Sequence, residues 1–154
     1  MLRAEGVLSL SDELIKAALS GQFPIEAMGP HFTKYHLPDG RVLHRFTADD
    51  GGAIHDHPWS FATEILRGGY IEEIWTHGPS QYHAGNQWYR DTYYRRQGDA
   101  RYVAATTIHT ITDLLDGECW TLVTPKAWER HTRFYRWHDG EFQSRQWDEE
   151  WPSE

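Results

Sequence analysis

Hydrophobic and polar positions along the chain follow two patterns, which change near residue 31. Residues 11–20 (SDELIKAALS) carry apolar side chains at the three- and four-residue spacing of an amphipathic helix. Ser11 can cap the first turn and Gly21 follows the last residue, so both ends show the usual helix signals. We therefore predict one short helix at 11–20, packed on the outside of the domain.

Over about 31–142 the pattern becomes that of short strands. Runs rich in aromatic and β-branched residues alternate with turn sequences such as Pro-Asp-Gly at 38–40, Gly-Gly at 68–69 and Asp-Gly at 139–140. The first and last of these turns predict hairpins, and the Gly-Gly joins another pair of strands. Regularly spaced turns without further helical periodicity indicate an all-β sandwich or barrel, and the length suggests one domain over 1–154.

The charge and cysteine content exclude several classes of protein. The formal net charge is -8 and the sequence pI is about 5.6, whereas a nucleic-acid-binding surface needs basic side chains to replace counterions. Cys119 is the single cysteine, which excludes an intrachain disulfide and a cysteine-based zinc site and fits a reducing compartment. No run approaches the roughly 18–20 apolar residues of a membrane span, and the first residues do not resemble a signal peptide. We expect a cytoplasmic protein with neither nucleic acid nor membrane as a partner.

The segment IHDHPWSFATEILRGGY (54–70) contains two histidines at the spacing that favours a shared ligand. Residues i and i+2 of a strand point to the same face, so His55 and His57 would project together while Asp56 points away. Imidazole binds iron, zinc, copper, nickel and manganese, so the pair alone does not select the metal. The ten histidines and 22 aromatic residues of the chain also suit a ligand cleft or a barrel interior.

The residues around this pair resemble the first motif of the cupin superfamily, which is G(X)5HXH followed by a strand and a glycine turn. Gly52 stands before His55, although two residues instead of five separate them, and Gly68 or Gly69 supplies the turn.

The second cupin motif, G(X)5PXG(X)2H(X)3N, fits in spacing from Gly98 to His109. Its Pro, second Gly and Asn positions hold other residues here: Ala104, Thr106 and Asp113. The resemblance extends over about residues 40–125. It implies a double-stranded β-helix (jelly-roll) barrel with one divalent transition metal ion inside.

The metal ligands that this resemblance implies are all histidines: His55, His57 and His109. The usual cupin glutamate lies seven residues before the turn glycine, which is Phe61 or Ala62 in this chain, and neither side chain can bind a metal. We predict that the nearest glutamates, Glu64 and Glu72, are not ligands.

A three-histidine site with the outline HDHPWSFATEILRGGYIEE is similar to that of the thiol dioxygenases. Members of that family carry an HDH-type pair, a serine three residues later (Ser60 here), an apolar strand, a glycine turn and a glutamate. Ala62 replaces the crosslinked cysteine of some members, and their Ser-His-Tyr relay has no counterpart in CWTLVTPKAW. This resemblance favours Fe(II) as the metal, with zinc, nickel and manganese as alternatives.

Five residues are candidates for binding a substrate. The guanidinium groups of Arg41, Arg45 and Arg101 could each hold a carboxylate through two parallel hydrogen bonds. Trp59 follows the histidine pair closely and would rim the pocket, with packing of the loop as the alternative. His44 lies on an apolar strand face in VLHRF, so it either lines the barrel or is a buried, hydrogen-bonded residue.

These features leave three functional hypotheses. The first is a non-heme Fe(II) dioxygenase acting on a small anionic substrate such as an acid or a thiol, because three neutral histidines leave the charge of the ion uncompensated. The second is a metal-dependent isomerase or lyase for a sugar or keto acid. The third is a non-enzymatic cupin that binds a small ligand. The resemblance to cupins is also compatible with a homodimer.

Overall fold

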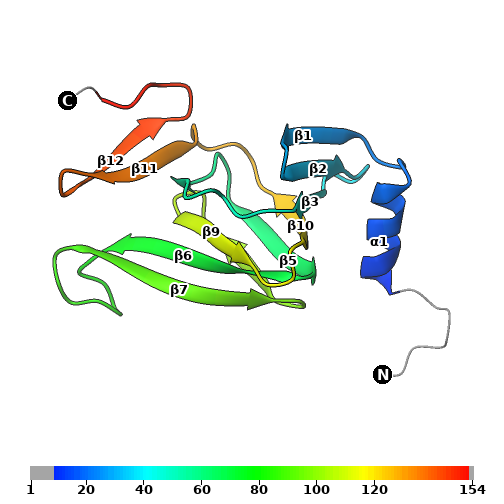
Figure 1. Cartoon of the computed structure of the whole chain (residues 1–154), viewed down its shortest axis with the longest axis horizontal. Coiled ribbons are helices and arrows are strands. Elements are labelled where there is room, and N and C mark those ends of the chain that lie inside the picture. The colour runs from blue at the N-terminus through cyan, green and yellow to red at the C-terminus, as the bar shows by residue number, and fades with distance from the viewer. Residues whose placement is uncertain (1–8, 153–154) are drawn as a thin grey trace.

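The computed structural model describes residues 9–152 as one helix and twelve strands arranged in two sheets (Figure 1). The first sheet has the order β1-β2-β3-β10-β5-β8, and the second has the order β12-β11-β4-β9-β6-β7. The elements are α1 (Leu10–Leu19), β1 (Ile25–Gly29), β2 (Phe32–His36), β3 (Val42–Phe46), β4 (Ile54–His55), β5 (Phe61–Arg67), β6 (Gly69–His77), β7 (Trp88–Arg96), β8 (Ala100–Val103), β9 (Ile108–Leu114), β10 (Cys119–Pro125), β11 (Arg133–His138) and β12 (Glu141–Gln146). The prediction of an all-β fold with one short N-terminal helix is confirmed.

The helix begins one residue earlier than predicted and has a different cap. The Ser9 hydroxyl accepts a hydrogen bond from the backbone N–H of Asp12 at 3.1 Å. Ser9 has the extended backbone that a capping residue needs, whereas Ser11 lies within the first turn. No helix among residues 9–152 has the length and apolar character needed to cross a membrane.

The helix packs on the outer face of the first sheet, as its amphipathic pattern predicts. Ile15 and Ala18 of α1 are each 1% exposed, while Leu19 at the end of the helix remains largely exposed. We call the cluster beneath the helix the outer core: Ile15, Ala18, Tyr35, Leu37, Leu43, Leu66 and Trp120.

The strands extend beyond the predicted range of 31–142 at both ends. β1 pairs with β2 at the edge of the first sheet, and β12 continues to Gln146. All five residues of β1 are exposed, so this strand lacks the alternation of apolar and polar residues by which a half-buried strand is recognised.

Two of the predicted turns form hairpins, and the Gly-Gly pair does not. β2 pairs with β3 around Pro-Asp-Gly, and β11 pairs with β12 around Asp-Gly. The strands on either side of Gly68-Gly69 lie in different sheets, because β5 pairs with β10 and β8 while β6 pairs with β7 and β9. The expected strand pair at this position is therefore a crossover between sheets.

The close approach of backbones explains the two glycines at this crossover. Gly68 has a positive φ of 79°, and a Cβ added there would lie 2.1 Å from the carbonyl oxygen of Glu118. A Cβ on Gly69 would lie 2.4 Å from the carbonyl oxygen of Arg95. Only glycine fits where the chain passes this closely between the sheets.

Apolar residues close one end of the barrel interior. The cluster there consists of Ile65, Tyr70, Ile111, Leu114 and Cys119. Cys119 has no exposed surface, and burial raises the pKa of its thiol to about 12, which makes it a buried apolar residue rather than a nucleophile. Tyr70 and Ile111 of this cluster also form part of the wall of a cavity that occupies the rest of the interior.

Candidate metal centre

Three histidines meet inside the barrel, as the sequence predicts. His55 ends β4, His57 follows two residues later, and His109 lies on β9 directly opposite His55 in the register of the second sheet. The nitrogens that could bind an ion all lie within 4.8 Å of one another. Among residues 9–152, no cysteine or carboxylate joins this cluster.

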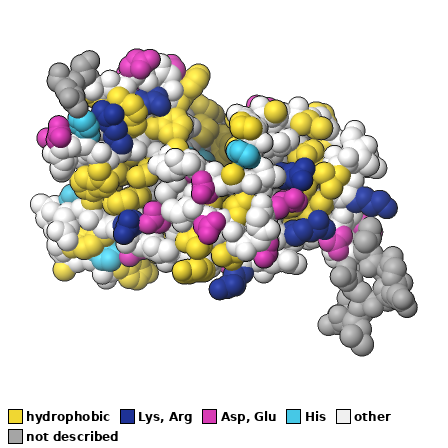
Figure 2. All heavy atoms as spheres, viewed as in Figure 1, with side chains coloured by type: hydrophobic (Ala, Val, Ile, Leu, Met, Phe, Trp, Pro, Cys, Tyr) yellow, Lys and Arg dark blue, Asp and Glu magenta, His cyan; other side chains and the backbone are white. Residues whose placement is uncertain are grey.

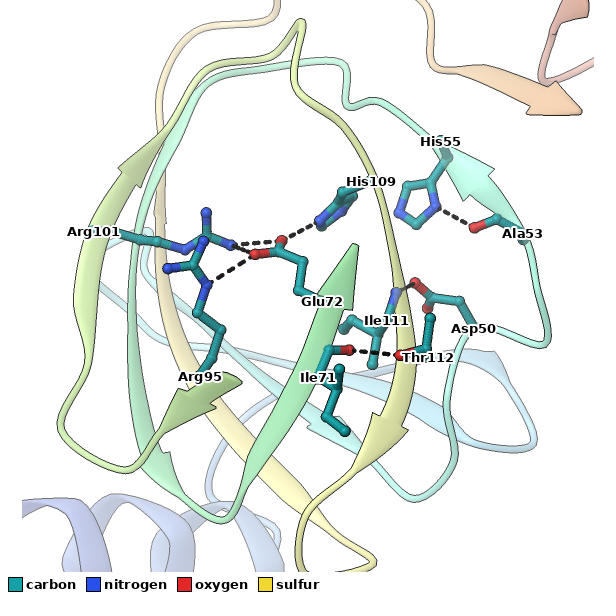
Figure 3. Close-up of polar contacts among 10 residues, drawn as sticks. All are labelled: Asp50, Ala53, His55, Ile71, Glu72, Arg95, Arg101, His109, Ile111 and Thr112. Carbon is teal, nitrogen blue, oxygen red and sulfur yellow. Dashed lines mark hydrogen bonds and ion pairs between the residues drawn. The ribbon is translucent and has the colours of Figure 1, made fainter. Parts of the chain in front are cut away.

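Hydrogen bonds leave lone pairs free on these rings. The Nδ1–H of His55 donates to the carbonyl oxygen of Ala53 at 3.0 Å, and the Nδ1–H of His109 donates to the Glu72 carboxylate (Figure 3). Because both partners only accept hydrogen bonds, Nδ1 of each ring carries a proton, and Nε2 is the atom with a free lone pair when the ring is neutral. Nε2 of His109 and Nδ1 of His57 are buried without a hydrogen-bond partner. Buried nitrogens of this kind are expected where a metal ion binds.

The surroundings of His55 and His57 favour the neutral form of both rings. Burial lowers the pKa of His55, and the charge of His109 lowers it further. Burial also places the pKa of His57 well below its usual value, with contributions from His109 and His55. Neutral imidazole is the form that binds a metal, so His55 and His57 are suited to bind an ion.

Glu72 supports His109 from behind instead of joining the ligands. Its carboxylate has no exposed surface and accepts hydrogen bonds from Arg101 at 2.7 and 2.6 Å and from Arg95 at 3.0 Å, besides that from His109 (Figure 3). Burial alone would raise the pKa of Glu72, but His109 and Arg101 outweigh it and lower the pKa to about 2. A carboxylate held in this way fixes the ring orientation and the tautomer of a metal-binding histidine.

Glu64, the other glutamate considered from the sequence, is exposed on β5. Its neighbours Thr63 and Ile65 are buried, because side chains alternate between the two faces of a strand. The prediction that neither glutamate is a ligand agrees with these positions and still awaits a metal-binding measurement.

Asp56, between the two histidines, ties their loop to the C-terminal hairpin. It has no exposed surface, and it accepts hydrogen bonds from the backbone N–H of Arg133 and from the Tyr135 hydroxyl, both at 2.8 Å. Arg130 lies 3.2 Å from the same carboxylate. The sequence predicts that Asp56 points away from its neighbours, but no pattern in the sequence identifies these partners, which lie more than 70 residues away.

The histidines lie in the wall of a cavity of about 640 Å³, within the usual size range of small-ligand sites. Six of its lining side chains are those of Phe, Tyr or Trp: Phe32, Phe46, Trp59, Phe61, Tyr70 and Phe134. On the molecular face shown in Figure 2, acidic and basic side chains are interspersed and form no continuous basic patch. The interior of the barrel is therefore the principal candidate for ligand binding.

Three of the five predicted substrate-binding residues line this cavity, namely Arg101, Trp59 and His44. Burial lowers the pKa of His44 to about 3, with further lowering by the charges of Lys34 and His36.

Two of the predicted substrate-binding arginines lie elsewhere. Arg41 is in the β2–β3 turn and pairs with Asp39 at 2.7 Å. Arg45 pairs with Glu118 at 3.2 Å and lies over the Trp120 ring, because it alternates with His44 and so faces away from the cavity. The structure therefore gives no support to these two arginines as substrate-binding residues of the cavity.

Lys34 is a cavity residue that sequence analysis missed. It lines the wall together with Phe32, its neighbour on the same face of β2. The signal was the i, i+2 spacing of these two residues, but it does not indicate which face of the strand is inside. Tyr35, on the other face, is also buried, since it belongs to the outer core.

Comparisons with known proteins support the fold. No protein-family model matches the sequence, and no curated protein matches it. The solved structure of hydroxypropylphosphonic acid epoxidase from S. wedmorenis is similar, with a TM-score of 0.50 and 14% identity over 80% of this chain and 61% of that chain. The same epoxidase with fosfomycin has a TM-score of 0.49 and 14% identity, covering 69% of this chain and 56% of that chain.

The fold is that of the cupins. This confirms the predicted fold class, and the three-histidine cluster is a group that could hold a metal ion. The chain spans about three-fifths of the length of that epoxidase. At 14% identity, the likeness concerns the fold and does not extend to a substrate.

Proposed function

We propose that this protein is a non-heme Fe(II) oxygenase that acts on a small anionic substrate. The observation that carries the proposal is the set of three histidines around one point inside an aromatic cavity, with Nε2 of His109 buried and unpaired. His55, His57 and His109 would hold the ion. The outline shared with thiol dioxygenases, and the similarity in fold to an enzyme named as an epoxidase, support iron and oxygen chemistry over the other metals.

The donor set accounts for the preference for anions. An Fe(II) ion on three neutral imidazoles would retain its full charge and supply open coordination positions and redox chemistry. Because the carboxylate of Glu72 is bound to Arg101 and Arg95, it does not neutralise the ion directly. A negatively charged substrate would supply the negative charge that three histidine ligands do not provide.

The residues of the chain prepare this site in two ways. Glu72 accepts the Nδ1 proton of His109 and keeps Nε2 directed to the centre. The His55–Ser60 loop is held by backbone and side-chain hydrogen bonds: Asp56 N–H donates to Arg133, His57 N–H donates to Ala105, and Ser60 accepts from Ala105. The walls of the cavity are rich in aromatic side chains, so charges inside it interact more strongly than they would in solvent.

The test is metal content combined with oxygen consumption. Protein purified without chelator and reconstituted anaerobically with Fe(II) should contain about one ion per chain, as a single three-histidine site requires. An oxygen electrode, with small acids and thiols added in turn, should show metal-dependent uptake. His55→Ala should lose both metal and uptake, whereas His131→Ala, which changes an exposed histidine, should lose neither.

Two outcomes would contradict the proposal. Absence of metal after reconstitution would leave a non-enzymatic ligand-binding cupin. Stoichiometric metal without oxygen uptake, combined with turnover of a sugar or keto acid, would instead favour an isomerase or lyase.

A further inference from the structure

Lys34 brings a positive charge to the wall of the cavity that holds the histidines. It is partly buried on β2 and lies opposite His44 in the β2–β3 register. Both side chains line the cavity. β2 belongs to the first sheet, whereas β4 and β9, which carry His55 and His109, belong to the second. The charge and the histidine cluster therefore approach the cavity from different sheets.

The ammonium group of Lys34 is held by aromatic rings and by no carboxylate. Its Nζ lies 5.8 Å from the centroid of the Phe32 ring and 5.8 Å from that of the Trp59 ring. Ring faces attract a cation but leave its three N–H donors available. Glu26, whose charge acts on Lys34, is itself bonded to His36 at 2.9 Å, and among residues 9–152 no acidic side chain forms an ion pair with Lys34.

The other charged groups of the cavity wall already have partners. Arg101 is bound to both oxygens of Glu72. Asp50 accepts a hydrogen bond from the backbone N–H of Ile111 at 2.7 Å, and Asp56 is bound to β11. A partly desolvated cation without a counter-ion is unfavourable, and burial accordingly lowers the pKa of Lys34. An anionic group of a bound ligand would serve as the counter-ion of Lys34.

One aromatic ring separates this cation from the histidine cluster. The Trp59 ring contacts the Lys34 ammonium and is stacked with the His57 ring, at 6.2 Å between centroids and 25° between planes. Phe61 meets both rings edge-on. Aromatic side chains therefore line the cavity wall between Lys34 and the histidines.

We propose that the substrate is an acid with an aromatic or similarly flat apolar body, whose anionic group binds Lys34, whose body lies along Trp59, and whose far end reaches the three histidines. The contact at Lys34 requires no metal. The contact at the far end rests on the proposed function.

Calorimetry on the metal-free full chain tests the contact at Lys34. The probes are 3-phenylpropionate and its uncharged amide, 3-phenylpropanamide, which have the same body. The acid should bind the wild type at least about tenfold more tightly than the amide. Lys34→Met should remove this difference and leave binding of the amide unchanged, while Lys34→Arg should retain most of it.

Lys126→Met is the matched control, because Lys126 is an exposed lysine that does not line the cavity. Circular dichroism and thermal unfolding of each variant separate a loss of binding from a loss of fold. Unchanged discrimination between acid and amide in a folded Lys34→Met variant, or an equal loss in Lys126→Met, would overturn the inference.

A two-ended probe separates this inference from the proposed function. 1,4-Phenylenediacetate carries a carboxylate at each end of one ring, and Zn(II), which has no redox chemistry, replaces iron. Loading with Zn(II) should tighten binding of this diacid at least about tenfold. If Zn(II) has no effect while Lys34→Met still weakens binding, the metal centre fails and the Lys34 contact stands. If Zn(II) tightens binding and Lys34→Met does not weaken it, the metal centre stands and the Lys34 contact fails.

Discussion

On β3, Leu43 lies in the outer core with none of its surface exposed, whereas His44, the next residue, lines the cavity. β10 repeats the arrangement, since Trp120 belongs to the outer core and Thr121 lines the cavity. The outer face is apolar and closely packed, while the inner face leaves about 640 Å³ unfilled. Substitutions one residue apart on the same strand should therefore alter stability or ligand binding separately.

The comparison also explains the presence of the helix. A barrel that keeps an interior space for a ligand gives up the contacts that would otherwise fill that space. Packing Ile15 and Ala18 of α1 against the outer face supplies a second apolar layer on the same strands. The sheet is thus stabilised on one face and free to carry polar residues on the other.

The largest expected effect is the loss of the metal site in His109→Ala. Removing a residue that only positions a ligand lowers metal affinity by roughly 10- to 100-fold. Removing a ligand itself should therefore weaken binding by more than about 100-fold. Elemental analysis after gel filtration measures the occupancy, with His131→Ala as the control. Full occupancy in His109→Ala would remove this residue from the ligand set.

Leu43→Ala should lower the stability of the protein and leave its metal stoichiometry unchanged. Truncating this buried side chain of the outer core should lower the free energy of unfolding by about 3 kcal/mol. Metal stoichiometry at a temperature well below the transition should stay at the wild-type value, because Leu43 does not line the cavity. Guanidinium denaturation gives the stability. A large loss of metal in the folded variant would mean that the two faces are coupled.

Glu72→Gln should weaken metal binding without abolishing it, by roughly 10- to 100-fold. The amide has a single acceptor oxygen for the donors of His109, Arg101 and Arg95, so the ring of His109 loses its fixed orientation. Competition with a chelator measures the affinity, and Glu64→Gln on the exposed face of β5 is the control. A loss as complete as that of His109→Ala would make Glu72 a ligand.

His44→Phe should change the pH dependence of stability in the metal-free protein. Unfolded histidine takes up a proton below its ordinary pKa of 6.5, but burial keeps folded His44 neutral down to about pH 3. Acid therefore favours unfolding, and protonation of His44 in the unfolded chain should lower the free energy of unfolding by about 1–2 kcal/mol from pH 7 to pH 5. The variant should lack that part of the decline, as urea denaturation at both pH values would show. If the free energy of unfolding falls equally in the variant and in the wild type, His44 is protonated in the folded state.

The fold and the ligand cluster could be predicted because their signals are local. Pro-Asp-Gly at 38–40 specifies a tight turn between strands, and the His-x-His spacing places His55 and His57 together. The spacing from Gly98 to His109 also holds, since Gly98 forms the turn before β8 with a positive φ of 92°.

The remaining features depend on which distant segments meet. The Gly68-Gly69 pair could join a hairpin or cross between sheets, and the choice depends on the distant strands with which β5 and β6 pair. Alternation places Arg45 and His44 on opposite faces but does not assign either face to the cavity, because α1 makes the outer face equally buried. For the same reason, the sequence does not indicate that Lys34 faces the cavity.

β4 is two residues long, yet both of its edges are used: His55 lies opposite Phe134 of β11 on one side and His109 of β9 on the other. The hydrogen bond from Tyr135 to Asp56 that reinforces this arrangement joins residues 79 positions apart. During synthesis, the strand carrying His55 thus waits for almost the whole chain before it gains its second neighbour. Contacts of such long range form late. Under the proposed function, capture of an ion would therefore follow the pairing of β4 with β11.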